Sequence, residues 1–468
     1  MSVAAETVCC MGDAVDGTGK VLVSHTGTPL TRPTTFRFTL DPNRAEHQQL
    51  LAYAGTARMV FNHQLGRVKA NLAQRAAESS YGLAAADLTP ALSWSKLSLI
   101  NHVNAWKDGR APDAPRTVTA DGTVVRGVTW RAEVAANVFE SASAHAAQAL
   151  ANWSASRAGA RGGKSVGFPR FKSRHKTKPS FRLRAKNTHG KAVPVRPTGP
   201  RRMRFPKLGE LRVREHTGQL AKMLARGRFH VYAASFRFEH GRWIVSVTGL
   251  AVQPHHARRS PAGRHPKPVG VDLGVTTLAT VADVDGLVLH EWAGVKALQH
   301  AQARLKLANQ AFARTKQGSG GRRKPAQRLG NIHRRIGALR CALLHEITST
   351  LARGYTAVVV EDLNVAGMLK NNTLARYLSD ASFGEIRRQL EYKTRWYGSR
   401  LVVADRWYPS SKTCSRCGDV KSDLSLADRV YRCEQCGFQL GRDVNAAINL
   451  ARQAITRSTA GQPRSVAA

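Results

Sequence analysis

The order of apolar and polar residues predicts a helical segment enclosed by strands in the first half of the chain. Strict alternation of the two kinds is typical of a half-buried strand, whereas apolar residues three or four positions apart form one face of a helix. By these patterns we expect strands at 35–40, 180–184, 228–232 and 242–247, and helices at 44–75, 93–107 and 131–157. The N-terminal half is therefore interpreted as a β-rich module with a helical insert.

The second half mixes strands and helices. We expect a long basic helix at 296–353, broken near 318–324, and strands at 269–274, 277–281, 287–289, 357–361 and 400–404. The Asp285-Gly286 pair is a hairpin signal between two of these strands. Continuous apolar residues, as at 357–360, indicate a strand buried on both faces, which is typical of a mixed sheet covered by helices. The predicted fold class is multidomain α/β.

The composition changes at both ends of the chain and between its halves. Residues 1–34 are predicted to be a poorly structured extension, 256–268 a linker rich in Pro, His and Arg, and 456–468 a flexible tail. A chain of 468 residues is too long for one compact core. No apolar run reaches the roughly 18–20 residues that a membrane span needs, and the first residues lack the order of a signal peptide. We expect a soluble, intracellular protein.

The charge balance indicates a polyanionic partner. Lys and Arg number 72 against 31 Asp and Glu, which leaves a formal charge of +41. A nucleic-acid backbone is the usual partner for such an excess. A genome rich in G and C would explain the preference for Arg over Lys, but not the shortage of acids. The candidate nucleic-acid contacts, each of which is otherwise a solvated surface charge, are Arg170, Lys172, Arg174, Arg322, Arg323, Lys324, Arg334 and Arg335.

Three acids occupy conspicuous positions in this acid-poor chain. Asp272 ends the first apolar strand of the second half, Glu361 ends the continuous apolar strand, and Asp443 opens a helix. Unpaired carboxylates at such places are costly unless a cation holds them, and hard oxygen ligands suit Mg²⁺ or Mn²⁺. The alternative for each residue alone is structural, with Asp272 capping a turn, Glu361 pairing with an arginine and Asp443 capping its helix. Together they predict a two-metal site for phosphodiester hydrolysis.

Four of the seven cysteines form two Cys-x-x-Cys pairs. Cys414 and Cys417 are separated by fifteen residues from Cys433 and Cys436, a spacing found in four-cysteine zinc ribbons. Four thiolate ligands leave zinc no open position for chemistry. The sequence therefore predicts a structural Zn²⁺ site, placed in the chain between the second and third carboxylates.

These motifs resemble those of the TnpB proteins of bacterial insertion sequences, which are related to the type V CRISPR effector nucleases. The resemblance is carried by 270–274, 360–364, 410–418 and 442–447, and by the N-terminal segments 36–38, 57–62, 167–173 and 180–183. It covers about residues 35 to 455 in the same order. The first thirty-odd residues, with Cys9 and Cys10, match no family marker.

The resemblance implies a RuvC-like RNase H fold at 269–455 with an inserted zinc ribbon at 410–438. A wedge β domain, 35–45 and 180–255, would precede it and contain a helical recognition domain, 46–179. It also implies an RNA-guided DNA endonuclease of the bacterial cytoplasm and nucleoid, and a monomer is favoured.

A guide RNA from the transposon end would pair with a double-stranded DNA target after the protein reads a short adjacent motif. Asp272, Glu361 and Asp443 would hold Mg²⁺. Three alternatives remain: a compact CRISPR effector, a nuclease-inactive repressor, and a strand-transferring transposase.

Overall fold

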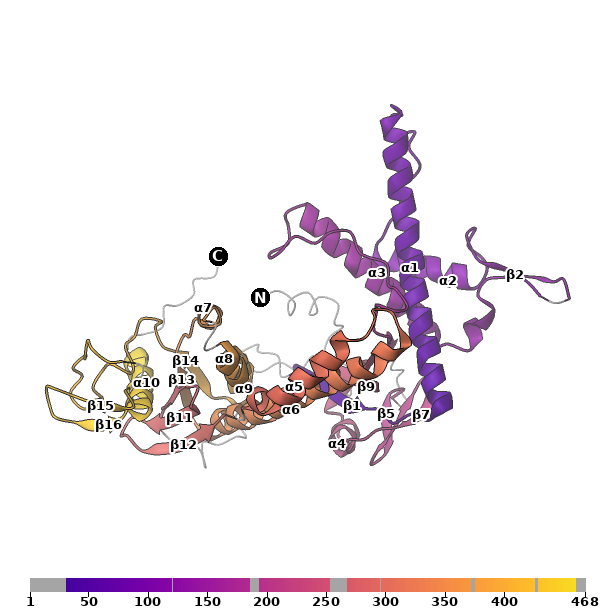
Figure 1. Ribbon diagram of the computed structural model, residues 1–468. Helices are drawn as coiled ribbons and strands as arrows, with labels where there is room; N and C mark the ends of the chain where they lie inside the picture. Colours follow the sequence, from indigo (N-terminus) through magenta and orange to yellow (C-terminus); the bar gives the residue numbers. More distant parts are fainter. Residues whose placement is uncertain are drawn as a thin grey trace. The chain divides into compact units, whose positions relative to one another are not determined.

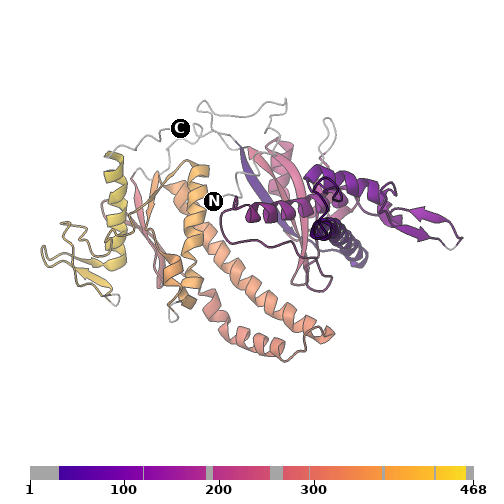
Figure 2. The same ribbon diagram turned by 90° about the horizontal axis from the view of Figure 1, so that it is seen from above.

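The computed structural model describes residues 31–119, 121–185, 193–252, 267–294, 296–371, 375–425 and 428–459. The chain forms two compact units, which divide between Gln253 and Pro254 (Figures 1 and 2). The predicted linker lies almost wholly outside the described residues, as do residues 1–30 and most of the predicted tail. None of the described helices is both long and apolar enough to cross a membrane.

The first unit is built on a four-stranded antiparallel sheet. Its order is β1-β9-β8-β4, so the first strand of the unit pairs with the last. The strands are β1 (Thr31–Thr39), β4 (Ser180–Arg184), β8 (Phe229–Glu239) and β9 (Arg242–Val252). Each strand alternates buried and more exposed residues, because one face packs against the unit's core and the other faces solvent.

Three helices lie in the chain between β1 and β4. They are α1 (Arg44–Ser80), α2 (Lys96–Lys107) and α3 (Ala136–Arg157), and the short hairpin β2 (Arg116–Val118) and β3 (Val124–Arg126) and the 3-10 turn η1 (Thr129–Ala132) lie among them. Asn43 and Glu46 form a reciprocal capping box that fixes the start of α1. Tyr53 of α1 and Phe139 of α3 are fully buried in the core that also contains Phe181 of the sheet.

A second, smaller sheet follows β4. It contains β5 (Arg196–Gly199), β6 (Arg202–Phe205) and β7 (Gly209–Arg212), and α4 (Gly218–Ala225) connects it to β8. Its buried side chains, including Met203 and Phe205, join the same core.

The second unit contains a five-stranded mixed sheet of order β12-β11-β10-β13-β14. The strands are β10 (Val269–Asp272), β11 (Thr277–Asp283), β12 (Val288–Ala293), β13 (Ala357–Val360) and β14 (Arg400–Val403). The pairs β10–β11 and β11–β12 are antiparallel, whereas β10, β13 and β14 run parallel to one another. The carboxyl ends of β10 and β13 therefore meet at one edge.

Helices cover both faces of this sheet (Figures 1 and 2). Val269, Val271, Val358 and Val360 pack against α6 (Arg323–Gly354) and α9 (Phe383–Tyr397). On the opposite face Val359 packs against Leu450 and Ala454 of α10 (Arg442–Thr459). The remaining elements of the unit are α5 (Ala297–Ala313), η3 (Gly320–Arg322), α7 (Val365–Met368), α8 (Ala375–Ala381), β15 (Val430–Arg432) and β16 (Gln439–Gly441).

The expected elements are present with shifted bounds. Strand β1 starts at Thr31, so residues 31–34 are part of the sheet and not of an unstructured extension. The pairing with β9 explains this difference, because Thr31 lies opposite Val252 at the far end of a long ladder. The β5–β7 sheet and the helices α4 and α8 were not expected, since short elements have too few residues to establish a period. Helix α9, with 15 residues, is long enough to show a period and was missed.

Gly270 allows helix α10 to lie directly against strand β10. A Cβ atom at this position would lie 1.9 Å from the backbone oxygen of Ala447 and 2.5 Å from the backbone nitrogen of Ala451. We therefore expect Gly270→Ala to push α10 away and to cost at least about 3 kcal/mol, the upper range for overpacking. Calorimetric unfolding of the whole chain would measure the loss as a lower melting temperature of the second unit.

The matched control is Gly337→Ala, in the exposed middle of α6, where a Cβ atom meets nothing within 4 Å. Because alanine favours a helix interior by up to about 1 kcal/mol over glycine, this variant should unfold at the same temperature as the wild type or higher. Equal melting of the Gly270→Ala and wild-type proteins would disprove the close approach.

Candidate functional site

Two of the three candidate carboxylates are neighbours because of strand register and side-chain alternation. Val271 of β10 lies beside Val360 of the parallel strand β13, so Asp272 and Glu361 are the next pair along the two strands. Side chains alternate between the two faces of a strand. Since Val360 packs on the α9 face, the next residue, Glu361, points to the α10 face. Asp272 lies on that face too, because it is two residues after Gly270, which lies against α10.

Asp443 comes from the first turn of α10, on that same face. The pKa of Asp272 is raised well above its usual value, first by burial and then by the negative charges of Glu361 and Asp443, whereas Arg442 acts in the opposite direction. The structure thus brings together the three acids that the sequence singled out. A buried carboxylate whose pKa is raised by two neighbouring acids marks a place where a divalent cation would be favoured.

The three carboxylates are not packed against one another. Within the described residues, two groups of at least three acidic, His or Cys side chains have ligand atoms all within 4.8 Å, and this trio is in neither group. At least one pair of acids is therefore further apart.

A loop after β14 holds Glu361 in place. The hydroxyl of Ser410 donates a short hydrogen bond to the Glu361 carboxylate, and the backbone oxygen of Ser410 accepts a hydrogen bond from Asn449 Nδ2 at 2.8 Å. Asn449 is buried on α10. The sequence analysis did not single out Ser410 or Asn449, although two asparagines four residues apart on an otherwise apolar helix face were a signal for buried polar contacts.

Asp362, next to Glu361, has a structural role. Its carboxylate pairs with Arg387 and, at 2.7 Å, with Arg406, and hydrogen bonds from these two side chains lower its pKa. Arg406 is thereby fixed on a turn whose next residue, Trp407, is 85% exposed. The Trp407 backbone nitrogen donates to the Asp405 carboxylate at 2.9 Å, so the exposed ring belongs to an ordered turn that lines a hollow together with Asp362 and Asp405.

The four candidate zinc ligands come together as expected. Their sulfur atoms all lie within 4.8 Å of one another, with Cys414 and Cys436 Sγ at 3.7 Å and Cys417 and Cys433 Sγ at 3.6 Å. Zn–S bonds of about 2.3 Å in a tetrahedron place two sulfurs about 3.8 Å apart. Burial raises the pKa of the Cys414 thiol, but the backbone N–H groups of Cys417 and Arg416 outweigh it and lower that pKa to about 7. The donor set therefore fits Zn²⁺.

The cysteine ribbon is joined to α10 by a second asparagine. Asn445, fully buried, accepts from the backbone nitrogen of Ser415 at 2.9 Å and donates to the backbone oxygen of Thr413 at 2.7 Å. Both partners lie next to the first zinc ligand. Any shift of the ribbon is thus transmitted to the helix that carries Asp443.

A further cluster, in the first unit, has a structural explanation. Asp113 lies 3.0 Å from His102 Nε2, 3.5 Å from His63 Nε2 and 3.1 Å from Arg67 Nε. Although the two histidines and the aspartate are close enough to share an ion, the Arg67 cation already compensates the carboxylate. Burial lowers the pKa of His63 to about 4, so its ring is neutral and stacks on Trp106 at 4.4 Å. These contacts join α1 to α2.

The eight predicted nucleic-acid contacts have different environments. Arg322 is used inside the protein: it donates to the Thr315 backbone oxygen at 2.6 Å and lies over the Phe312 ring at 3.8 Å. Its cation therefore stabilises the turn between α5 and α6. Lys172 is half-buried, and Arg170, Arg174, Arg323, Lys324, Arg334 and Arg335 are exposed.

The two aromatic residues beside Lys172 differ from each other. Phe168 packs edge-on against Trp153, with ring centres 5.0 Å apart, as expected for a packing residue. Phe171 is 50% exposed, so only part of its ring packs. The ring edge lies near Gly66 on α1.

Comparison with known proteins gives two family matches in the second unit. Residues 252–372 match the OrfB_IS605 family, described as "Probable transposase", and residues 383–450 match the "Cas12f1-like, TNB domain". The second range contains the four cysteines and Asp443. A solved structure titled "Cryo-EM structure of the Cas12f1-sgRNA-target DNA complex" aligns with 87% of this chain and 82% of its own, at 13% identity and a TM-score of 0.44.

Relatives along most of the chain define the family. A Mycobacterium tuberculosis protein named "Putative RNA-guided DNA endonuclease Rv2885c" is 36% identical, over 89% of this chain and 85% of its own length. A Streptomyces pristinaespiralis protein is 33% identical over 71% and 75%, and the Escherichia coli protein InsQ is 25% identical over 90% and 92%; both have the same descriptive name. The chain belongs to the transposon-encoded TnpB family of RNA-guided DNA endonucleases.

Proposed function

We propose that this chain hydrolyses DNA phosphodiester bonds at Asp272, Glu361 and Asp443 under the direction of a guide RNA. The observation that carries the proposal is the convergence of these three carboxylates on the α10 face of the mixed sheet, where Asp272 feels the charge of both others. In a chain of charge +41, such a concentration of negative charge needs a function.

The donor set fits Mg²⁺ or Mn²⁺, because it offers hard carboxylate oxygens. When bound, two such ions lower the pKa of an attacking water and neutralise charge on the leaving oxygen. Asp272 and Glu361, from adjacent parallel strands, would supply ligands on one side, and Asp443 would supply them from the helix.

The protein's own groups orient these ligands. Ser410 donates to Glu361 and so limits the orientations that its carboxylate can take. Arg442, whose charge acts on Asp272, counters part of the repulsion within the trio. Helix α10 also points its amino end, with a partial positive charge, toward the site.

The finer domain assignment is part of the proposal. The five-stranded order, antiparallel at one side and parallel at the other, supports a RuvC-like RNase H fold at 269–455 with the zinc ribbon inserted at 410–438. In the sheet β1-β9-β8-β4, a helical segment is inserted in the chain between β1 and β4. This arrangement supports a wedge β domain with a helical recognition domain at 46–179. The guide RNA and the DNA target would share the cationic surfaces of these domains.

The presence of all three carboxylates favours cleavage over a nuclease-inactive repressor. A carboxylate site with metal-activated water favours hydrolysis over strand transfer. A compact CRISPR effector would use the same chemistry, and the insertion-sequence family match at 252–372 favours the transposon-encoded form.

Replacing Asp272 tests the proposed site. Asp272→Ala should lower Mg²⁺-dependent cleavage of a guide-matched DNA duplex by at least about 10³-fold, as expected for loss of a catalytic group. Binding of RNA and DNA should stay within a few-fold of wild type, since no base or backbone contact is removed. Glu291→Gln, an exposed acid on the edge strand β12, is the matched control and should cut normally. Undiminished cutting by Asp272→Ala would refute the site.

Replacing one cysteine tests the zinc site. Cys417→Ser should reduce the zinc content from one ion per chain toward zero, as measured by elemental mass spectrometry. It should also lower the melting temperature of the second unit, because a structural zinc site contributes directly to folding. Cys341→Ser removes an exposed cysteine outside the cluster and should change neither quantity. Full zinc occupancy in Cys417→Ser would contradict a four-cysteine site.

The bound RNA tests the guidance. Protein purified from its native host should carry one discrete small RNA whose variable end matches the DNA that the protein cuts. Sequencing of the extracted RNA is the measurement, and a shuffled guide should redirect cleavage. Heterogeneous RNA fragments without a common sequence would argue for non-specific binding by a basic protein.

A further inference from the structure

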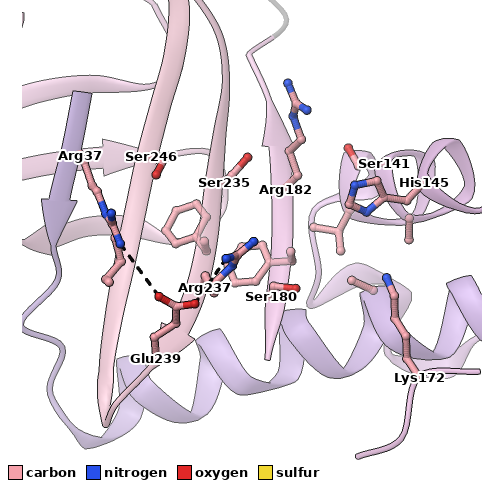
Figure 3. A pocket seen from close by; sticks show the side chains of 16 residues that line it. Arg37, Ser141, His145, Lys172, Ser180, Arg182, Ser235, Arg237, Glu239 and Ser246 are labelled. Carbon is pink, nitrogen blue, oxygen red and sulfur yellow. Dashed lines mark hydrogen bonds and ion pairs between the residues drawn. The ribbon is translucent and has the colours of Figure 1, made fainter. Parts of the chain in front are cut away.

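The first unit contains a cavity of about 380 Å³ beside the edge strand β4 (Figure 3). Strands β1, β4, β8 and β9 line it, together with α3, part of α1 and the segment that includes Lys172. Ten of its side chains carry polar groups: Arg37, Ser141, His145, Lys172, Ser180, Arg182, Ser235, Arg237, Glu239 and Ser246.

The strand residues of this cavity form an ordered row. Arg37 on β1 lies opposite Ser246 on β9, Ser246 lies opposite Ser235 on β8, and Ser235 lies opposite Arg182 on β4. Strands are about 4.8 Å apart, so the row is roughly 14 Å long. An arginine thus stands at each edge of the sheet, with two hydroxyl groups between them.

Glu239, the acid that lines this cavity, balances the positive charge at one end of the cavity only. Glu239 lies 3.9 Å from Arg37, 3.3 Å from Arg237 and 3.2 Å from Lys178. Three cations around one carboxylate already satisfy that group. Figure 3 shows Glu239 among the arginines, away from His145 and Lys172.

The other end is cationic without a counter-charge. Among the described residues, Lys172 and Arg182 form no ion pair with a carboxylate, and the Lys172 ammonium lies over the Phe61 ring at 3.8 Å. The pKa of His145 is lowered by burial and then by the charges of Lys172 and Arg182, so both cations lie close enough to the imidazole ring to affect it. Burial lowers the pKa of the half-buried Lys172, which is the cost of holding its charge there without an anion. Arg182 is more exposed, and beside partial desolvation the Arg184 cation also lowers its pKa.

A buried hydroxyl provides an independent sign of a missing ligand. Ser141 is only 9% exposed, lines this end of the cavity, and its Oγ has no hydrogen-bond partner. A buried polar group left without a partner costs about 1–3 kcal/mol. Ser141 lies one helical turn before His145 on α3, so both side chains face the same opening (Figure 3).

The backbone that presents Lys172 is fixed. The Asn62 side chain accepts from the Lys172 backbone nitrogen at 2.7 Å and donates to its backbone oxygen at 2.9 Å. Asn62 thereby ties the segment to helix α1. A cation held this way is ordered in advance, so that little entropy is lost when an anion binds.

We propose that this end of the cavity binds a backbone phosphate of RNA through Lys172, Arg182 and the Ser141 hydroxyl. The phosphate supplies the missing negative charge, and its oxygens accept from all three groups. The serines along the row, Ser235 and Ser246, lie where ribose hydroxyls of the same strand would follow, and the 2′-OH is the group by which proteins distinguish RNA from DNA. This proposal rests on the proposed function, since the RNA so held is the guide.

The test uses binding of fluorescein-labelled rU20 and dT20 to the full chain, without divalent ions, over a range of salt concentrations. A backbone contact is independent of sequence, so a homopolymer reports it without the native guide. Lys172→Gln/Arg182→Gln should weaken rU20 binding about 10-fold or more at moderate salt. The slope of log K against log[salt] should become shallower by about 0.7 for one lost phosphate contact on a single strand. Arg204→Gln, an exposed arginine on β6, is the control for charge alone and should have a much smaller effect.

Ser141→Ala separates this ligand site from a purely structural role. If the hydroxyl awaits a phosphate, its removal should weaken rU20 binding several-fold and leave the unliganded protein as stable as the wild type or more so, because an unsatisfied buried group is lost. Lower stability with unchanged RNA affinity would overturn the proposal.

Two other results would also overturn the proposal. Unchanged rU20 affinity in the double variant, with a normal melting temperature, would mean that no phosphate binds there. Equal losses for rU20 and dT20 would assign the site to either backbone and not to RNA. Asp272→Ala is measured alongside and should bind rU20 as the wild type does, so failure of the cleavage assignment and failure of this site are distinguishable.

Discussion

The close approach of helix α10 to strand β10 determines the geometry of the second unit. A glycine at 270 and alanines at 447 and 451 remove the side chains that would otherwise separate strand from helix. Helix α10 then closes the sheet face that carries Asp272 and Glu361, and its first turn brings Asp443 to them. The three acids are far apart in sequence, and this contact brings together the elements that carry them, as the proposed site requires.

The same helix also connects the cysteine cluster to the carboxylates. Asn445 holds the backbone beside Cys414, and Asn449 holds Ser410, whose hydroxyl reaches Glu361. Buried amides of this kind are stable only when their partners stay in place. A structural metal can therefore influence a site to which it contributes no ligand, because it fixes the loop that orients Glu361.

The parts of this architecture that follow strong local rules could be predicted from the sequence. The carboxylates stood out because each ends or begins an apolar element, and the cysteines because their spacing suits a tetrahedral site; the structure places both sets as neighbours. The strand register brings Asp272 and Glu361 side by side, since each follows one of two valines that are paired across the strands. Ser410 and Asn449 were missed because their contacts span long sequence separations, and the small β5–β7 sheet because its strands are only four residues long.

Net charge indicates a polyanionic partner but does not identify the side chains that contact it. The local environment of each cation gives that information. Arg322 was a candidate contact by charge, yet its guanidinium stabilises a turn. Arg387, which is equally cationic, pairs with Asp362. Lys172 differs from them because it is half-buried and, among the described residues, pairs with no carboxylate. Arg182, which lines the same cavity, is more exposed and likewise forms no ion pair within the part of the chain that the structure describes. An unpaired, partly buried cation lowers the stability of the folded chain, and an anionic ligand that pairs with it restores that stability. The unpaired cations that line a cavity, and not the many that are already paired, are therefore where we expect the excess positive charge of this protein to contact a nucleic-acid backbone.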